Sequence, residues 1–215
     1  FEHQWNLFKA GAEERGICLF GDMPIYIALD SSDAWAHPQR LLLNEDGQPS
    51  FIAGVPPDYF SADGQLWGKP LYDCSYNETT EYRWWIERIQ HASLQTPLVR
   101  IDHFRGFESF WSVPFGAKTA RDGQWEMGPG DNLFLAMRKV MGTLPIVAED
   151  LGVITPAVDQ LRENHGLPGM VVLQFEVGDQ NFDIDSVNEK IVCYTGTHEN
   201  DTTLGLFRSN GAVTR

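Results

Sequence analysis

Residues 99–110 read VRIDHFRGFESF and place several charged side chains directly after a short apolar run. The run LVRI predicts a buried strand that ends at Asp102. Arg100 lies two positions before Asp102, so in a strand the two side chains project from the same face. A folded core tolerates charge only where it is paired or takes part in chemistry. The pair is therefore either a salt bridge that stabilises the fold or part of a functional site.

The same order of apolar run and polar residue recurs along the chain. Further strands are predicted at ICLF, PIVA, MVVLQF and IVCYTGT, and polar residues follow them at Asp22, Glu149, His198 and Glu199. Helical spacing of apolar residues predicts helices at 1–12, 78–91, 131–141 and 155–164. Strands that alternate with helices indicate a parallel sheet, whose functional residues gather at the carboxyl ends of the strands.

We expect an α/β fold, a TIM (β/α)8 barrel in preference to an open doubly wound sheet. Five strands are predicted, whereas a complete barrel needs eight strands and about 250 residues. The prediction is therefore one partial catalytic barrel domain over 1–215, lacking strands at both ends. Periodicity is lost at about 23–76, which predicts a long loop insertion, and its aromatic content argues against disorder.

The composition indicates a globular protein with an acidic surface. The chain is 42% hydrophobic, and 16 Lys and Arg face 30 Asp and Glu, which gives a net charge of -14. Such a field repels polyanions, so nucleic acid and anionic membranes are not expected as partners. An uncharged or cationic ligand suits this charge better.

The cysteines and the absence of long apolar runs predict a cytoplasmic location. Cys18, Cys74 and Cys193 are widely spaced and form no CxxC pair, so neither a disulfide framework nor a zinc site is expected. No stretch resembles a membrane span or a secretory signal. No phosphate-binding glycine motif is present, and we expect neither a metal nor a cofactor.

Acids at several predicted strand ends suggest chemistry on glycosidic bonds. Asp22, Asp102, Glu149 and Glu199 each follow an apolar run. Retaining cleavage needs a carboxylate nucleophile and a second carboxyl group that acts as acid and then as base, about 5 to 5.5 Å apart. The alternative is that these acids cap the helices that follow them.

Neighbouring residues suggest a role for each acid. Arg100 could keep Asp102 ionised, although a structural salt bridge would look the same. Burial next to PIVA would raise the pKa of Glu149 toward that of a useful general acid. His103 and His198 could bind sugar hydroxyls, or each could be an ordinary structural histidine.

The predicted insertion carries aromatic and polar residues that suit a sugar. The candidates for binding are Asp58, Tyr59, Phe60 and Trp67. Aromatic faces stack on the apolar faces of pyranose rings, while polar groups bind the hydroxyls. The alternative is a small core that holds the insertion together, and for Trp35, Trp84 and Trp85 we prefer it.

Six stretches resemble consecutive motifs of the 4-alpha-glucanotransferases of glycoside hydrolase family 77, also called amylomaltases or disproportionating enzymes. They are GDMPIYIALDSSDAWAHP, AGVPPDYFSADGQLWGKPLYD, VRIDHFRGFESFW, VAEDLGVITPAV, LPGMVVLQF and YTGTHENDTT. The resemblance extends from near Phe1 to about Gly205 in the order of the family. It implies a TIM barrel of the alpha-amylase clan, in glycogen and starch metabolism.

The resemblance also implies roles for individual residues. Asp102 resembles the nucleophile, Glu149 resembles the general acid/base, and Arg100 would support the nucleophile. His198 would contact the sugar on the non-reducing side of the cleaved bond. Asp22 lies in the motif at the end of the third strand of the family.

The insertion and the third acid complete the implied site. The loop that carries Asp58, Tyr59, Phe60 and Trp67 would cover the cleft and favour a sugar acceptor over water. Glu199 occupies the position of the third catalytic carboxylate, which is usually aspartate, and its extra methylene displaces the carboxylate. The expected substrates are maltose, maltotriose and longer maltooligosaccharides. A non-catalytic glucan-binding relative and an alpha-1,4-glucan hydrolase stay as alternatives.

Overall fold

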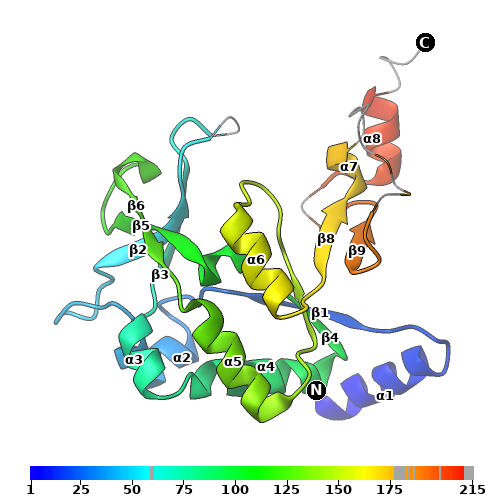
Figure 1. The fold of residues 1–215 in the computed structure, drawn as a ribbon, viewed down its shortest axis with the longest axis horizontal. Coiled ribbons are helices and arrows are strands. Elements are labelled where there is room, and N and C mark those ends of the chain that lie inside the picture. The colour runs from blue at the N-terminus through cyan, green and yellow to red at the C-terminus, as the bar shows by residue number, and fades with distance from the viewer. Residues whose placement is uncertain (59–60, 177–182, 184, 186, 199, 211–215) are drawn as a thin grey trace.

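Three parallel strands cross the middle of the computed structural model (Figure 1). They are β1 (Phe20–Pro24), β4 (Leu98–Asp102) and β7 (Ile146–Ala148), hydrogen-bonded in the order β1-β4-β7. The structure describes residues 1–215 except 59–60, 177–182, 184, 186, 199 and 211–215. Because the strands are parallel, their carboxyl ends meet at one edge, where Asp102 ends β4 and Glu149 follows β7. The predicted strand ICLF is wrong, since β1 begins only at Phe20 and Asp22 lies inside it rather than after its end.

A second parallel pair follows in the chain. β8 (Gly169–Val172) pairs with β9 (Ile191–Tyr194). β8 begins beside the end of β7, because the Ala148 N–H donates to the Pro168 carbonyl at 2.8 Å. On the other side, the rings of Phe20 and Tyr194 are stacked with centroids 6.4 Å apart. The alternating strands and helices confirm an α/β chain, whereas the incomplete barrel stays a prediction.

The helices alternate with these strands along the chain, with α1 before β1 and α8 after β9. They are α1 (Glu2–Glu13), α2 (Ser32–Ala36), α3 (Cys74–Thr79), α4 (Arg83–Gln95), α5 (Gly130–Met141), α6 (Pro156–Asn164), α7 (Leu173–Glu176) and α8 (Thr203–Asn210), with short 3-10 turns η1 (Pro38–Arg40), η2 (Phe104–Phe107) and η3 (Ala120–Asp122). Among the described residues, no helix is both long and apolar enough to cross a membrane.

The core lies where α4 and α5 pack against the central strands. The fully buried side chains of Ile89, Ile101 and Phe134 belong to it, and η2 adds Phe104 and Phe107. The ring of Phe134 lies 5.6 Å from that of Phe104 and 5.4 Å from that of Phe107. The chain that leaves β4 is therefore anchored in the core immediately beyond Asp102.

The predicted long loop at 23–76 is wrong for much of its length. It contains α2, η1 and α3 as well as β2 (Phe51–Val55) and β3 (Gln65–Pro70). These strands form an antiparallel sheet with β5 (Ser109–Pro114) and β6 (Gln124–Met127), in the order β3-β2-β5-β6. Figure 1 shows this sheet, called here the insertion sheet, on the opposite side of the molecule from β8 and β9.

Two further predictions fail locally. The predicted strand MVVLQF ends at Val172, and α7 begins at the next residue. The predicted helix at 78–91 begins only at Arg83, because Glu81 and Tyr82 adopt left-handed backbone conformations with φ of 51° and 54°. Together with Thr80, these two residues separate α3 from α4.

The structure divides the three tryptophans for which we preferred a packing role. Trp84 and Trp85 are buried, which confirms that prediction. Trp35 is 86% exposed, so for this residue the prediction is wrong. The five-residue α2 buries only Ala34 and leaves Trp35 in solvent.

Candidate active site

Arg100 binds two carboxylates at the edge of the central sheet. Its Nε lies 2.9 Å from Asp22 Oδ1 and its Nη2 lies 3.0 Å from Asp22 Oδ2, a bidentate pair across β1 and β4. The same Nη2 lies 3.1 Å from Asp102 Oδ1, which confirms the predicted Arg100–Asp102 pair. The arginine side chain is 11% exposed, whereas those of Asp22 and Asp102 are 47% and 44% exposed. The cation therefore lies beneath two carboxylates that face solvent.

The neighbouring carboxylates keep the guanidinium of Arg100 protonated. Burial lowers its pKa, but the hydrogen bond and charge of Asp22, together with Asp102 and Glu149, outweigh burial and raise the pKa above its ordinary value. A guanidinium that is always charged and presents a planar fork suits this arrangement better than a lysine would.

Glu149 lies beside Asp102 at the end of the adjacent strand. Ile101 pairs with Ala148, and the next residues on these strands are Asp102 and Glu149. The Glu149 carboxylate accepts two backbone hydrogen bonds, from His103 N at 2.7 Å and from Leu151 N at 2.8 Å. The two candidate catalytic carboxyl groups therefore occupy neighbouring positions.

The pKa of Glu149 is raised, as its position after PIVA predicted. Burial is the largest cause, and the charge of Asp102 acts in the same direction. The two backbone hydrogen bonds and the charge of Arg100 lower the pKa but do not cancel burial. A carboxyl group with a raised pKa can carry a proton nearer to neutral pH, as a general acid must.

The insertion sheet reaches this site through Trp67. This residue was predicted on a loop but lies in β3, and its ring meets the ring of His103 edge-on with centroids 4.7 Å apart. The ring of Tyr26 lies 6.1 Å from Trp67 and 6.4 Å from His103. Burial, assisted by the charge of Arg105, lowers the pKa of His103 to about 4. His103 is therefore neutral at pH 7.

Of the remaining predicted binding residues, the structure describes Asp58 and His198. Asp58 lies beyond β2, where its Oδ1 accepts from Ser61 N at 2.7 Å. His198 is exposed in a turn after β9. Tyr59, Phe60 and Glu199 lie outside the described residues.

Sequence reasoning missed Tyr194, which belongs to the same stretch, YTGTHEN, as His198. It is the last residue of β9 and lies close enough to Arg100 and Asp22 for their charges to act on it. Burial raises its pKa, Arg100 lowers it, and Asp22 raises it further. The position of Tyr194 directly after an apolar run was the available signal.

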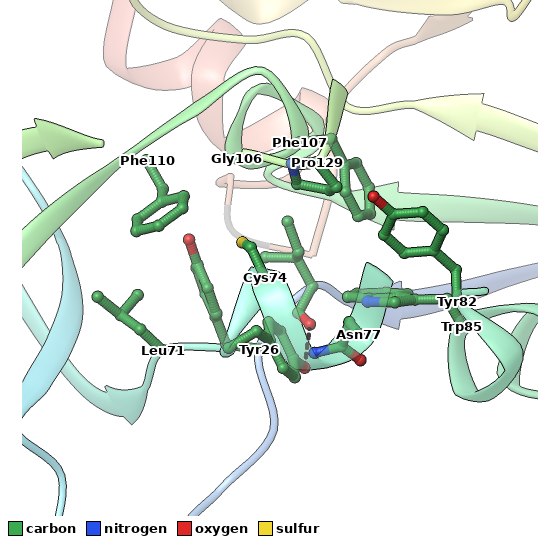
Figure 2. Close-up of a pocket in the computed structure, with 12 residues that line it drawn as sticks. Tyr26, Leu71, Cys74, Asn77, Tyr82, Trp85, Gly106, Phe107, Phe110 and Pro129 are labelled. Atoms are coloured by element: carbon green, nitrogen blue, oxygen red, sulfur yellow. Dashed lines mark hydrogen bonds between the residues drawn. The ribbon is translucent and has the colours of Figure 1, made fainter. Parts of the chain in front are cut away.

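Figure 2 shows a small cavity whose lining residues include none of these carboxylates. Its volume is about 20 Å³, and its lining includes Tyr26, Leu71, Trp85, Phe107 and Phe110. This space is about that of one water molecule, far too small for a sugar. The cavity is therefore a packing defect between the insertion and the core.

Functional residues of α/β barrels gather at the carboxyl edge of the sheet, and a pair of carboxyl groups such as the one found here is what cleavage of a glycosidic bond needs. A family model described as 4-alpha-glucanotransferase matches residues 1–215. The chain belongs to this 4-alpha-glucanotransferase family.

Individual relatives agree with the family model. The chain is 49% identical over 217 residues to a 4-alpha-glucanotransferase of Thermus thermophilus, covering 97% of this chain and 43% of the relative. It is 51% identical over 211 residues to a 4-alpha-glucanotransferase of Synechocystis sp., covering 95% and 42%. The chain thus spans less than half the length of these relatives.

A solved structure has the same fold over nearly the whole chain. It is an amylomaltase from Streptococcus agalactiae in complex with acarbose, at a TM-score of 0.90 and 40% identity. The likeness covers 97% of this chain and 43% of that structure.

Proposed function

We propose that this protein is a retaining 4-alpha-glucanotransferase that moves alpha-1,4-linked glucan segments between maltooligosaccharides. The observation that carries the proposal is the placement of Asp102 and Glu149 at adjacent strand ends, with Arg100 bound to Asp102 and Asp22. Membership of the family supports it.

In the first half of the reaction, Asp102 and Glu149 act on the same glycosidic bond from two sides. A carboxylate oxygen of Asp102 attacks the anomeric carbon, and the bond from that carbon to the leaving oxygen breaks. Glu149 gives its proton to that oxygen, which departs as the 4-hydroxyl of the released glucan. The partial exposure of Asp102 and the raised pKa of Glu149 fit these roles.

In the second half, the roles reverse. The Glu149 carboxylate takes the proton of an acceptor 4-hydroxyl, whose oxygen attacks the anomeric carbon and releases Asp102. The two carboxyl groups supply nucleophile, acid and base, so the reaction requires no cofactor.

The remaining predicted residues bind the sugar in this proposal. Asp22, His103, His198 and Glu199 hydrogen-bond its hydroxyls, and the insertion around Asp58, Tyr59, Phe60 and Trp67 favours a sugar acceptor over water. The contact of Trp67 with His103 supports a position near the site.

We also propose that residues 1–215 form part of a (β/α)8 barrel of the alpha-amylase clan, and that the protein acts in the cytoplasm on maltose, maltotriose and longer oligomers. The parallel strands β1, β4, β7, β8 and β9 support the barrel. The three free cysteines support a reducing compartment.

Incubation of the full protein with maltotriose tests the transferase. The expected products are glucose together with oligomers longer than maltotriose. Release of only glucose and maltose would indicate the hydrolase alternative. Asp102→Asn is expected to remove both activities, and retained activity would exclude Asp102 as the nucleophile.

A non-catalytic glucan-binding protein is the second candidate, because Glu199 replaces the usual aspartate of the family. Glu199→Asp distinguishes the two. A binding protein has no turnover until the aspartate is restored, whereas a functional transferase turns over with either residue.

A further inference from the structure

The carboxylate of Glu149 is held by backbone groups from two segments. Leu151 N donates to Oε1 at 2.8 Å from the loop after β7. His103 N donates to Oε2 at 2.7 Å from the end of β4. The orientation of the carboxylate thus depends on where the chain turns after Asp102.

That turn is made at His103, which adopts a left-handed backbone with φ 56° and ψ 49°. Non-glycine residues rarely take this conformation, and β-branched residues disfavour it most. Immediately beyond the turn, Phe104 N donates to the Glu149 carbonyl at 3.2 Å. The left-handed turn therefore directs two successive N–H groups at Glu149, one to its side chain and one to its backbone.

The imidazole ring of His103 is packed in a way that holds the turn. Trp67 of β3 meets the ring edge-on at 4.7 Å, and Tyr26 approaches it at 6.4 Å. Gly106 leaves room for the ring, since a Cβ at this position would lie 3.3 Å from His103 Cδ2 and 2.8 Å from Ile25 Cδ1. The strained backbone is thus accompanied by close contacts around its side chain.

We infer that His103 is a positioning residue that orients the Glu149 carboxylate through its left-handed backbone N–H. The inference rests on the proposed function for the catalytic role of Glu149. The hydrogen bond from His103 N to Glu149 Oε2 is observed independently of that function. It assigns to His103 a role that does not require the imidazole to bind sugar or to transfer a proton.

The test compares His103→Asn with His103→Val in the full protein. The two side chains have similar volumes and both remove the ring, but asparagine tolerates the left-handed region and valine does not. This pair differs in polarity as well as in backbone preference. A glycine–alanine pair at the same position has no polar side chain and isolates the backbone conformation. The charges acting on Glu149 are those of Asp102 and Arg100 from β4, and they are the same in both variants, as is Asp22 of β1, which is paired with Arg100.

The readout is the titration of Glu149 followed by NMR of ¹³C-labelled glutamate, with the signal assigned by its loss in Glu149→Gln. An N–H donor stabilises the charged carboxylate, so losing it raises the pKa of Glu149. We expect Glu149 to titrate about one pH unit higher in His103→Val than in His103→Asn. Equal titration in the two variants, or the opposite order, would overturn the inference.

A second pair covers the case in which His103→Val does not fold. Glycine favours the left-handed region and alanine does not, so His103→Ala is expected to titrate above His103→Gly. The basic limb of kcat/KM for maltotriose is expected to move in the same direction, a shift that general destabilisation does not produce.

The acid/base role of Glu149 and the positioning role of His103 can be disproved independently of each other. Full transfer activity in Glu149→Gln would end the acid/base assignment while leaving an NMR difference intact. Equal NMR titrations with an inactive Glu149→Gln would leave the acid/base role standing and remove the role of His103.

Discussion

At the residue scale, the single guanidinium of Arg100 binds two carboxylates. Its bidentate pair with Asp22 joins β1 to β4, and its remaining contact holds Asp102. The predicted salt bridge is confirmed, and its geometry is compatible with the catalytic role proposed for Asp102. A largely buried cation with two half-exposed anions binds the strands together and leaves carboxylate oxygens available to a substrate.

The geometry of this fork predicts that Arg100→Lys is not a conservative change. Lysine keeps the charge but cannot hold Asp22 through two parallel bonds while reaching Asp102. We expect kcat for transfer from maltotriose to fall about 10- to 100-fold, and Arg100→Ala to fall further. Arg121→Lys is the control, because its pair with Asp63 is exposed on both sides. Equal loss in the control would contradict the prediction.

Arg105, by contrast, is a structural residue. The residue is 7% exposed. Its guanidinium donates to the Val153 carbonyl and to Ser109 Oγ, and lies 4.1 Å from the ring centroid of Trp125. These contacts join η2, the loop after β7 and the insertion sheet.

Truncation of Arg105 is therefore expected to lower stability. Arg105→Ala leaves a carbonyl without its partner and removes packing from Trp125, so the free energy of unfolding should fall by about 2–3 kcal/mol. Arg15→Ala is the matched control, because Arg15 is exposed just beyond α1 and its guanidinium donates to the nearby Gly11 carbonyl. Urea denaturation measures both, and equal effects would count against the structural role of Arg105.

At the element scale, the insertion sheet brings Trp67 to the site. β2 and β3 pair antiparallel, and β2 also pairs with β5, the strand that follows η2 beyond Asp102. The insertion sheet therefore combines strands that precede Asp102 in the chain, β2 and β3, with strands that follow it, β5 and β6. Its correct folding is a condition for the placement of Trp67.

The turn before β3 provides a test at Gly64. Its φ is +67°, and a Cβ there would overlap the Val55 carbonyl oxygen. Gly64→Ala is expected to cost about 3 kcal/mol or more of unfolding free energy and to impair transfer activity. Gly47→Ala, at φ +74° with open space around its Cβ, should cost only about 1 kcal/mol. Thermal and urea unfolding compare the two, and similar losses would show that crowding at Gly64 is unimportant.

At the scale of the whole molecule, the candidate site links stability to pH. The folded state holds His103 neutral and lowers its pKa to about 4, whereas the unfolded chain has a pKa of about 6.5. Between these values the unfolded state binds more protons, so stability rises with pH. The contribution of His103 is fully present above pH 6.5 and lost as the pH falls toward 4.

This linkage predicts the behaviour of a variant. The free energy of unfolding should decrease between pH 6.5 and pH 4 in the native protein, with His103 accounting for at most about 3 kcal/mol. In His103→Asn this part of the slope should be missing. Urea denaturation at several pH values measures the difference, and an unchanged slope would place the relevant proton elsewhere.

The elements that could be predicted are those with a regular local pattern of apolar residues. β4, α5 and α6 follow clear apolar patterns, and the structure places α5 at Gly130–Met141 against a predicted 131–141. The insertion sheet was missed because FIAGV and QLWGKP contain glycine or proline and alternate poorly. Its pairing of Phe51 with Pro114 joins segments distant in the chain, which no local pattern reveals.

The sequence by itself determined that Asp102 and Glu149 stand at strand ends, because period and composition place them directly after apolar runs, whereas Asp22 lies inside β1. Only the tertiary structure decided what those side chains bind. Arg100 pairs with a partner 78 residues away, and Glu149 is held by the backbone of His103, 46 residues away. Such contacts depend on which strands become neighbours and on how deeply each group is buried. Both are set by packing of the whole chain rather than by any local stretch of it.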